Sequence, residues 1–175
     1  MHNLIVGITY TGKTNLCKSI AHNSDKNIIV YDPLSSTGWG DNAIKFSSPD
    51  KFFKYIETAQ NAFVFVDEGK TLWDVNPKEA DKLLYKRRHQ GLLTFVIAQR
   101  TMMIPPNARN MCSKVFAFKQ RKNDCDILRE EYGEAFAQCL NLELGEFIAT
   151  DGFNVSRMYL DYSQFPPLIK EKAET

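Results

Sequence analysis

Residues 7–14 read Gly-Ile-Thr-Tyr-Thr-Gly-Lys-Thr and match G-x-x-x-x-G-K-[ST], a spacing that serves phosphate binding. The glycines let the backbone curl, so that its N–H groups point at phosphate oxygens. We expect Lys13 to reach the β- and γ-phosphates of a bound ATP, and the Thr14 hydroxyl to ligate Mg²⁺. The residues expected to contact the nucleotide are Gly7, Ile8, Thr9, Tyr10, Thr11, Gly12, Lys13, Thr14 and Asn15.

Two carboxylates follow a buried-strand pattern, because Asp67 and Glu68 come directly after the apolar run 63–66. In a parallel sheet, ligands bind at the carboxyl edge of the strands, where both side chains would lie. We expect Asp67 to help hold the Mg²⁺ bound by Thr14, and Glu68 to act as the general base for the attacking water. The alternative is a helix N-cap cluster or a pair of solvated loop acids, which the phosphate-binding pattern disfavours.

Gln99 and Arg100 end a further apolar run, and a polar amide at this place can orient a water or sense the γ-phosphate. The alternatives are a turn glutamine that bonds the local backbone, and an arginine that makes a structural ion pair. Both residues are candidates for the site, Gln99 as a catalytic residue and Arg100 as a weaker one.

Lys86, Arg87 and Arg88 form the densest basic cluster in the chain. An arginine that reaches a neighbouring subunit's nucleotide would stabilise transition-state charge, and we favour Arg88 over Arg87 for this role. Two alternatives remain: the charges complement a helix C-terminus, or they bind DNA phosphates. A second basic patch at 119–122 is expected to be solvated surface.

The elements that must position these residues alternate between strands and helices, which favours a parallel sheet covered on both faces. The predicted fold is α/β, a P-loop NTPase three-layer sandwich of the RecA/ASCE type, with an antiparallel edge hairpin near the C-terminus. Residues 1–162 form the predicted ATPase domain, and residues 163–175 a flexible or docking tail. Residues 34–48 are expected to be a loop. The expected strands are 4–6, 27–31, 62–66, 92–98 and 114–118, with the hairpin at 146–150 and 155–160.

Composition excludes several classes of protein. The chain has 175 residues and a net charge of +1, so it lacks the strongly basic character of a typical nucleic-acid binder. Its four cysteines are scattered, which fits reduced thiols rather than a metal site or a disulfide framework. No signal peptide and no membrane-spanning run is expected.

In order along the chain, these motifs resemble those of the FtsK–HerA superfamily of hexameric DNA-pumping ATPases. The matching segments are Gly7–Thr14, Asp32-Pro33, Val66-Asp67-Glu68, Arg88 three residues before Gly91, Gln99-Arg100, Ile104-Pro105 and Arg109-Asn110. The resemblance implies a fourth predicted strand inserted between the first and third, and ATP bound at subunit interfaces. It also implies Glu68 as the base, Gln99 as a sensor and Arg88 as a trans-acting finger, with Asp32 a weaker candidate.

The short chain looks like the genome-packaging ATPases of membrane-containing, double-jelly-roll viruses (the PRD1-like group). This resemblance implies a homo-oligomeric ring, expected to be a hexamer, that pumps double-stranded DNA into a capsid. Capsid vertex proteins are possible partners, and the expected location is the virion or the host cytoplasm. The alternatives are a HerA-like or filamentous-phage-assembly-like ATPase, a small-molecule P-loop kinase, and a slow nucleotide-dependent scaffold.

Overall fold

The computed structural model describes residues 2–172 and contains one nine-stranded sheet with the order β3-β2-β4-β5-β1-β6-β7-β8-β9. The strands are β1 (His2–Val6), β2 (Asn27–Tyr31), β3 (Ala43–Phe46), β4 (Ala62–Val66), β5 (Leu93–Ala98), β6 (Cys112–Phe118), β7 (Glu146–Thr150), β8 (Val155–Asp161) and β9 (Leu168–Glu171). The insertion of β5 between β1 and β4 confirms the strand order that the resemblance implies.

The central strands are apolar and fully covered, as expected for a parallel sheet with helices packed on it. The first six strands in the order of the sheet, from β3 through β1 to β6, run parallel to one another. The pairs β6–β7, β7–β8 and β8–β9 are antiparallel. In register, Val6 pairs with Ala98, and Val66 pairs with Val96. The strands β1, β4 and β5 therefore end close together, so the residues that follow them meet at one edge.

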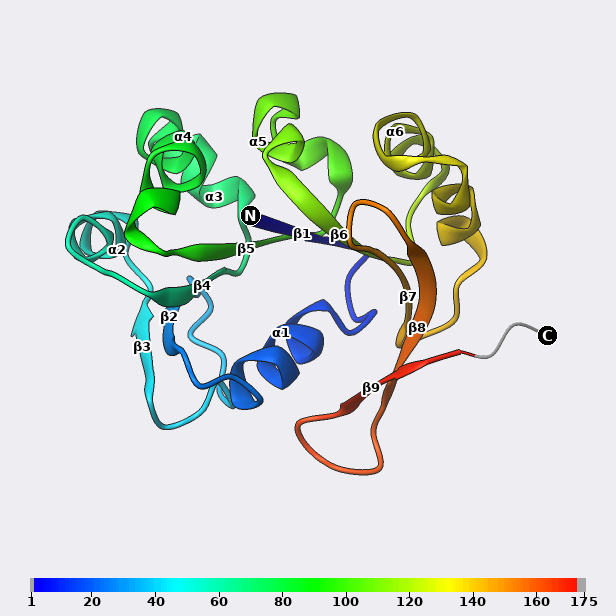
Figure 1. Cartoon of the computed structure of the whole chain (residues 1–175), viewed down its shortest axis with the longest axis horizontal. Coiled ribbons are helices and arrows are strands. Elements are labelled where there is room, and N and C mark those ends of the chain that lie inside the picture. Colours follow the sequence, from blue (N-terminus) through cyan, green and yellow to red (C-terminus); the bar gives the residue numbers. More distant parts are fainter. Residues whose placement is uncertain (1, 173–175) are drawn as a thin grey trace.

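The helices divide unequally between the two faces (Figure 1). One face carries α2 to α6, whereas α1 lies on the other, where the sheet curls around it. Two separate apolar cores result, one on each face of the sheet. The helices are α1 (Lys13–His22), α2 (Pro49–Ile56), α3 (Lys70–Val75), α4 (Pro77–Tyr85), α5 (Pro106–Asn110) and α6 (Lys122–Tyr132), with 3₁₀ turns η1 (Arg87–Gln90), η2 (Thr101–Met103) and η3 (Glu134–Asn141).

Local sequence signals explain where several helices begin and end. Pro49 and Pro77 each occupy the first turn of a helix, where a missing N–H costs nothing. The Asn76 side chain accepts a hydrogen bond from the Glu79 backbone N–H at 3.2 Å and so caps α4. Gly133 follows the last residue of α6. No helix within residues 2–172 is long and apolar enough to cross a membrane.

Two strands lie where the sequence indicates other structure. β3 falls in the expected loop 34–48, and β9 falls in the expected tail. Both strands have four residues, and β9 is exposed along its whole length, so neither shows the apolar pattern of a buried strand. The predicted hairpin of β7 and β8 is confirmed, and β9 extends it by one strand. The expected tail also includes residues 173–175, which lie outside the described part of the chain.

Candidate nucleotide-binding site

The segment between β1 and α1 is tied to the strands on both sides of β1. The Gly7 N–H donates to the Ala98 carbonyl at the end of β5, and the Ile8 N–H donates to the Lys119 carbonyl beyond β6. A Cβ on Gly7 would lie 2.6 Å from the Cβ of Phe118, so the close approach of these strands requires glycine. This loop, residues 7–12, thus has a fixed position at the carboxyl edge of the sheet.

Lys13 is the first residue of α1, and its side chain folds back over the loop. Its Nζ donates a hydrogen bond to the Ile8 carbonyl at 2.9 Å. Burial lowers the pKa of Lys13, and the negative charges of Asp67 and Glu68 oppose this effect. The ammonium group therefore lies inside the curl of the loop, where phosphate oxygens are expected.

Thr14 and Asp67 meet across the site, and the Thr14 hydroxyl donates to Asp67 Oδ2 at 3.2 Å. Burial, together with the charges of Asp32 and Glu68, raises the pKa of Asp67 to about 6. A hydroxyl and a carboxylate are the hard oxygen ligands that Mg²⁺ prefers. A bound cation would also relieve the repulsion among these carboxylates, so the donor set fits this ion.

A chain of hydrogen bonds joins the phosphate loop to Glu68, the residue expected to act as the general base. Thr9 donates from its hydroxyl to Gln99 Oε1 at 3.3 Å, and Gln99 Nε2 donates to Glu68 Oε1 at 2.9 Å. Glu68 has a φ of 57°, in the left-handed region that non-glycine residues seldom adopt. Such backbone strain is typical of functional positions.

Asp32 follows β2, and its carboxylate accepts hydrogen bonds from the loop that comes directly after it. Burial alone would raise its pKa, but hydrogen bonds from Ser36, Trp39 and Leu34 hold the pKa below its usual value. The Trp39 indole, which is buried, donates to Asp32 Oδ2 at 3.3 Å. Asp32 thus organises the segment 32–39 on one side of the site.

These groups surround one pocket of about 480 Å³. Asp67, Glu68 and the amide of Gln99 line it together, and Lys13 is the only lysine or arginine among the described residues that line it. Sequence reasoning missed four of the lining residues, since none belongs to a motif. The four are Leu34, Ser36, Leu144 and Tyr162.

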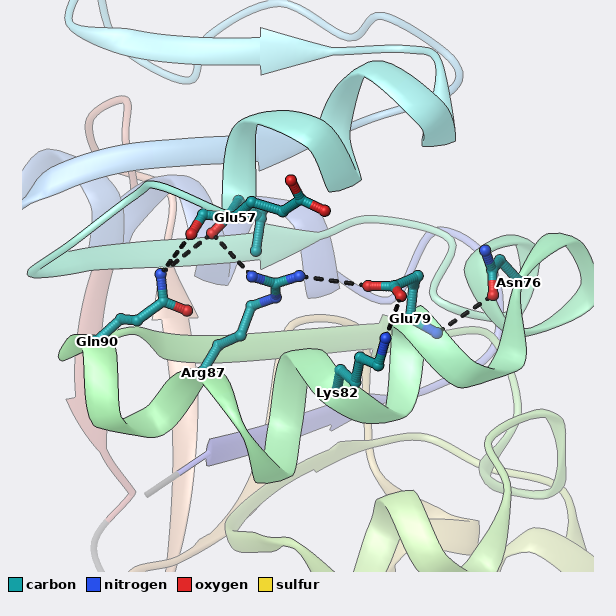
Figure 2. A network of polar contacts seen from close by, with 7 residues as sticks. Glu57, Asn76, Glu79, Lys82, Arg87 and Gln90 are labelled. Atoms are coloured by element: carbon teal, nitrogen blue, oxygen red, sulfur yellow. Dashed lines mark hydrogen bonds and ion pairs between the residues drawn. The ribbon is translucent and has the colours of Figure 1, made fainter.

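The two arginines of the basic cluster differ in their surroundings. Arg87 is buried and donates to Glu79 Oε2 at 3.3 Å and to the Ile56 carbonyl at 3.4 Å. Figure 2 shows this network, in which Gln90 also donates to carbonyls at the end of α2. Arg88 is exposed instead. The structure thus gives Arg87 a role in joining η1, α4 and α2, and leaves Arg88 at the surface.

Arg88 lies near the amino ends of the parallel strands, and the pocket lies at their carboxyl ends. Arg88 precedes β5, whereas Gln99 follows it. Six strand residues rise by about 20 Å, so Arg88 lies far from the pocket of its own chain. Arg100 is held by an ion pair with the buried Asp124, at 3.0 Å from Nε to Oδ2, which is the structural alternative expected for it.

No protein-family model and no curated protein matches the chain. Solved structures do. The sulfate complex of the genome-packaging NTPase B204 from Sulfolobus turreted icosahedral virus 2 has a TM-score of 0.75 at 17% identity and covers 89% of this chain and 94% of its own. The DNA-packaging ATPase B204 of Sulfolobus turreted icosahedral virus has a TM-score of 0.68 at 15% identity, and the alignment covers 99% of this chain and 98% of the B204 chain.

A third similar structure is the pCW3 conjugation coupling protein TcpA with ATPγS. It has a TM-score of 0.66 at 15% identity and covers 89% of this chain and 58% of its own. At such identities the likeness establishes the fold. The chain therefore has the P-loop α/β fold of these packaging and coupling ATPases, as its resemblance to the FtsK–HerA superfamily predicts.

Proposed function

We propose that the protein is an ATP-hydrolysing motor that translocates double-stranded DNA, acting as a viral genome-packaging ATPase. The observation that carries this proposal is the convergence of Lys13, Thr14, Asp67, Glu68 and Gln99 on one pocket at the phosphate loop. The fold shared with packaging and coupling ATPases supports it. A virion or host-cytoplasm location and contact with capsid vertex proteins belong to the same proposal.

In this function the loop N–H groups and Lys13 bind the β- and γ-phosphates. Mg²⁺, held through Thr14 and Asp67, would neutralise phosphate charge when bound. Glu68 accepts a proton from the attacking water as the general base. Gln99 donates from Nε2 to the Glu68 carboxylate and accepts at Oε1 from the Thr9 hydroxyl of the loop, so it can respond to an occupied γ-phosphate position.

The proposal includes a ring in which Arg88 serves the pocket of a neighbouring subunit. Two features support a trans-acting arginine: Arg88 lies at the far edge of β5, and Lys13 is the one basic side chain that the described residues bring to the pocket. A contact between the amino ends of the strands in one subunit and the carboxyl ends in another is heterologous, and heterologous contacts form a ring when the rotation between subunits closes. The ion pair of Arg87 with Glu79 leaves Arg88 as the better candidate.

The test is ATP hydrolysis with and without long double-stranded DNA for the wild type, Glu68→Gln and Arg88→Ala. DNA should stimulate the wild type, and each variant should lose at least about 100-fold in turnover. Glu68→Gln should still bind ATP. Mixing the two variants should restore activity, because a Glu68→Gln subunit lends its Arg88 to a site whose Glu68 is intact.

Arg129→Ala is the matched control, since Arg129 is a half-exposed arginine with only long ion pairs and such pairs contribute little to stability. Normal hydrolysis by Glu68→Gln would refute the base assignment. Turnover that ignores DNA and shows no rescue would direct attention to small-molecule phosphoryl acceptors instead.

A further inference from the structure

The pocket has an apolar end, formed by Leu144 and Tyr162, that the phosphate chemistry does not use. The exposed fractions of these two residues are 76% and 51%. Exposed apolar side chains are common singly, but four of them line this polar phosphate site, since Tyr10 and Leu34 are exposed there too. Their position beside the loop calls for an explanation.

The strand order sets the direction of a nucleotide in the pocket. Glu68 and Gln99 follow β4 and β5, on one side of β1, and the residues of the apolar end lie beside β7 and β8, on the other. Hydrolysis requires the γ-phosphate next to Glu68. The chain of phosphates then crosses the loop at the start of α1, and the base is directed toward Leu144 and Tyr162.

The apolar end is fixed to the phosphate loop by direct contacts. The Gly145 N–H donates to the Thr11 carbonyl at 3.2 Å, and Asn15 Nδ2 donates to the Tyr162 hydroxyl at 3.4 Å. A Cβ on Gly12 would lie 3.0 Å from the Tyr162 hydroxyl. The tyrosine ring and the loop therefore have a defined relative position, which suits a ligand that spans both.

We propose that Leu144 and Tyr162 form the nucleobase subsite of the pocket. The subsite binds the base by apolar contact and stacking on the tyrosine ring. The inference rests on the proposed function and adds the recognition of the ligand. Two side-chain polar groups lie at this end, on Asn15 and Tyr162, and they bond each other. The subsite therefore favours purines over pyrimidines for their larger stacking area, and discriminates weakly between adenine and guanine.

The test measures equilibrium binding of non-hydrolysable ATP, GTP and CTP analogues and of inorganic tripolyphosphate, with Mg²⁺ present. Tyr162→Ala should weaken ATP-analogue binding by on the order of tenfold and leave tripolyphosphate binding unchanged. Tyr162→Phe, which keeps the ring, should bind as the wild type does. Phe153→Ala is the matched control, because Phe153 is 96% exposed and lies at the tip of the β7–β8 hairpin, at the opposite edge of the sheet.

Three results would overturn the subsite: full ATP-analogue affinity in Tyr162→Ala, equal loss of ATP analogue and tripolyphosphate in that variant, or a preference of more than about 100-fold for one purine. The second result would mean that Tyr162 supports the phosphate loop alone. A wild type that binds neither ligand would refute the proposed function itself, and the subsite with it. Binding of tripolyphosphate by the wild type separates these two failures.

Discussion

At the scale of single residues, the surroundings of Asp67 disfavour the charged form of its carboxyl group. Burial and the charges of Asp32 and Glu68 raise its pKa from 3.8 to about 6. The folded protein thus binds this proton more tightly than the unfolded chain does. Without Mg²⁺ or nucleotide, the charge of Asp67 lowers the free energy of unfolding as the pH rises from about 4 through about 6.

Asp67→Asn should therefore raise the free energy of unfolding of the ligand-free protein at pH 7 by on the order of 2–3 kcal/mol. The gain should disappear below about pH 4, where the wild-type carboxyl is neutral in both states. Urea unfolding in a chelator between pH 4 and 7.5 measures this. Asp25→Asn, at an exposed position, is the control. A stability difference that stays constant with pH would contradict this account of Asp67.

Much of the candidate site follows from sequence, because its motifs place polar groups at strand ends. Asp67 and Gln99 follow two different strands and Thr14 lies in the first turn of α1, yet the parallel register brings all three to one pocket. Leu144 and Tyr162 show the limit. Their place in the pocket depends on β7 and β8 returning beside the phosphate loop, and no local pattern in the sequence encodes that contact.

At the scale of elements, Glu146 joins β7, β8 and the chain beyond β9. Its side chain accepts a hydrogen bond from Arg157 Nη2 at 2.7 Å and another from Lys172. Burial alone would raise the pKa of Glu146, but these bonds and the Glu143 N–H lower it to about 2. The carboxylate therefore stabilises the fold at neutral pH, and this stabilisation is lost as the pH falls from about 4.5 through about 2.

Glu146→Gln should lower the free energy of unfolding at pH 7 by on the order of 2–3 kcal/mol. The difference from the wild type should shrink as the pH approaches 2. Urea unfolding at pH 7 and at pH 2.5 tests both statements, with the exposed Glu130→Gln as control. An equal loss at the two pH values would show that the glutamine disturbs packing rather than removing an ion pair.

Elements with a strong apolar pattern were predictable, and those that depend on a neighbour were not. β2, β4 and the β7–β8 hairpin begin at the residues that the sequence indicates. β9 pairs with β8, and the carbonyl of Pro167 beside it accepts a hydrogen bond from the buried Ser19 of α1. Since β9 owes its position to these partners, its own four residues carry no signal for a strand.

At the scale of the whole molecule, a net charge of +1 gives one subunit little attraction for DNA. A ring sums the few basic side chains that each copy presents to its channel, and counterion release makes the total depend strongly on salt. We therefore expect weak DNA binding by the monomer, and tighter binding with a steeper salt dependence once an ATP analogue promotes assembly. Fluorescence anisotropy with duplex DNA at several salt concentrations measures both. Tight, sequence-specific binding by the monomer would contradict the proposed motor.

The central place of β1 has a consequence for how the chain folds during synthesis. β1 is the first strand made, but it pairs with β5 and β6, with Leu4 opposite Val96 on one side and Val115 on the other. Both partners emerge from the ribosome about a hundred residues later, and such distant pairings form slowly. The phosphate loop, tied to Ala98 and Lys119, therefore acquires its shape only after β6 has been translated. Nascent chains arrested before β6 should fail to bind nucleotide, although they already contain the whole motif.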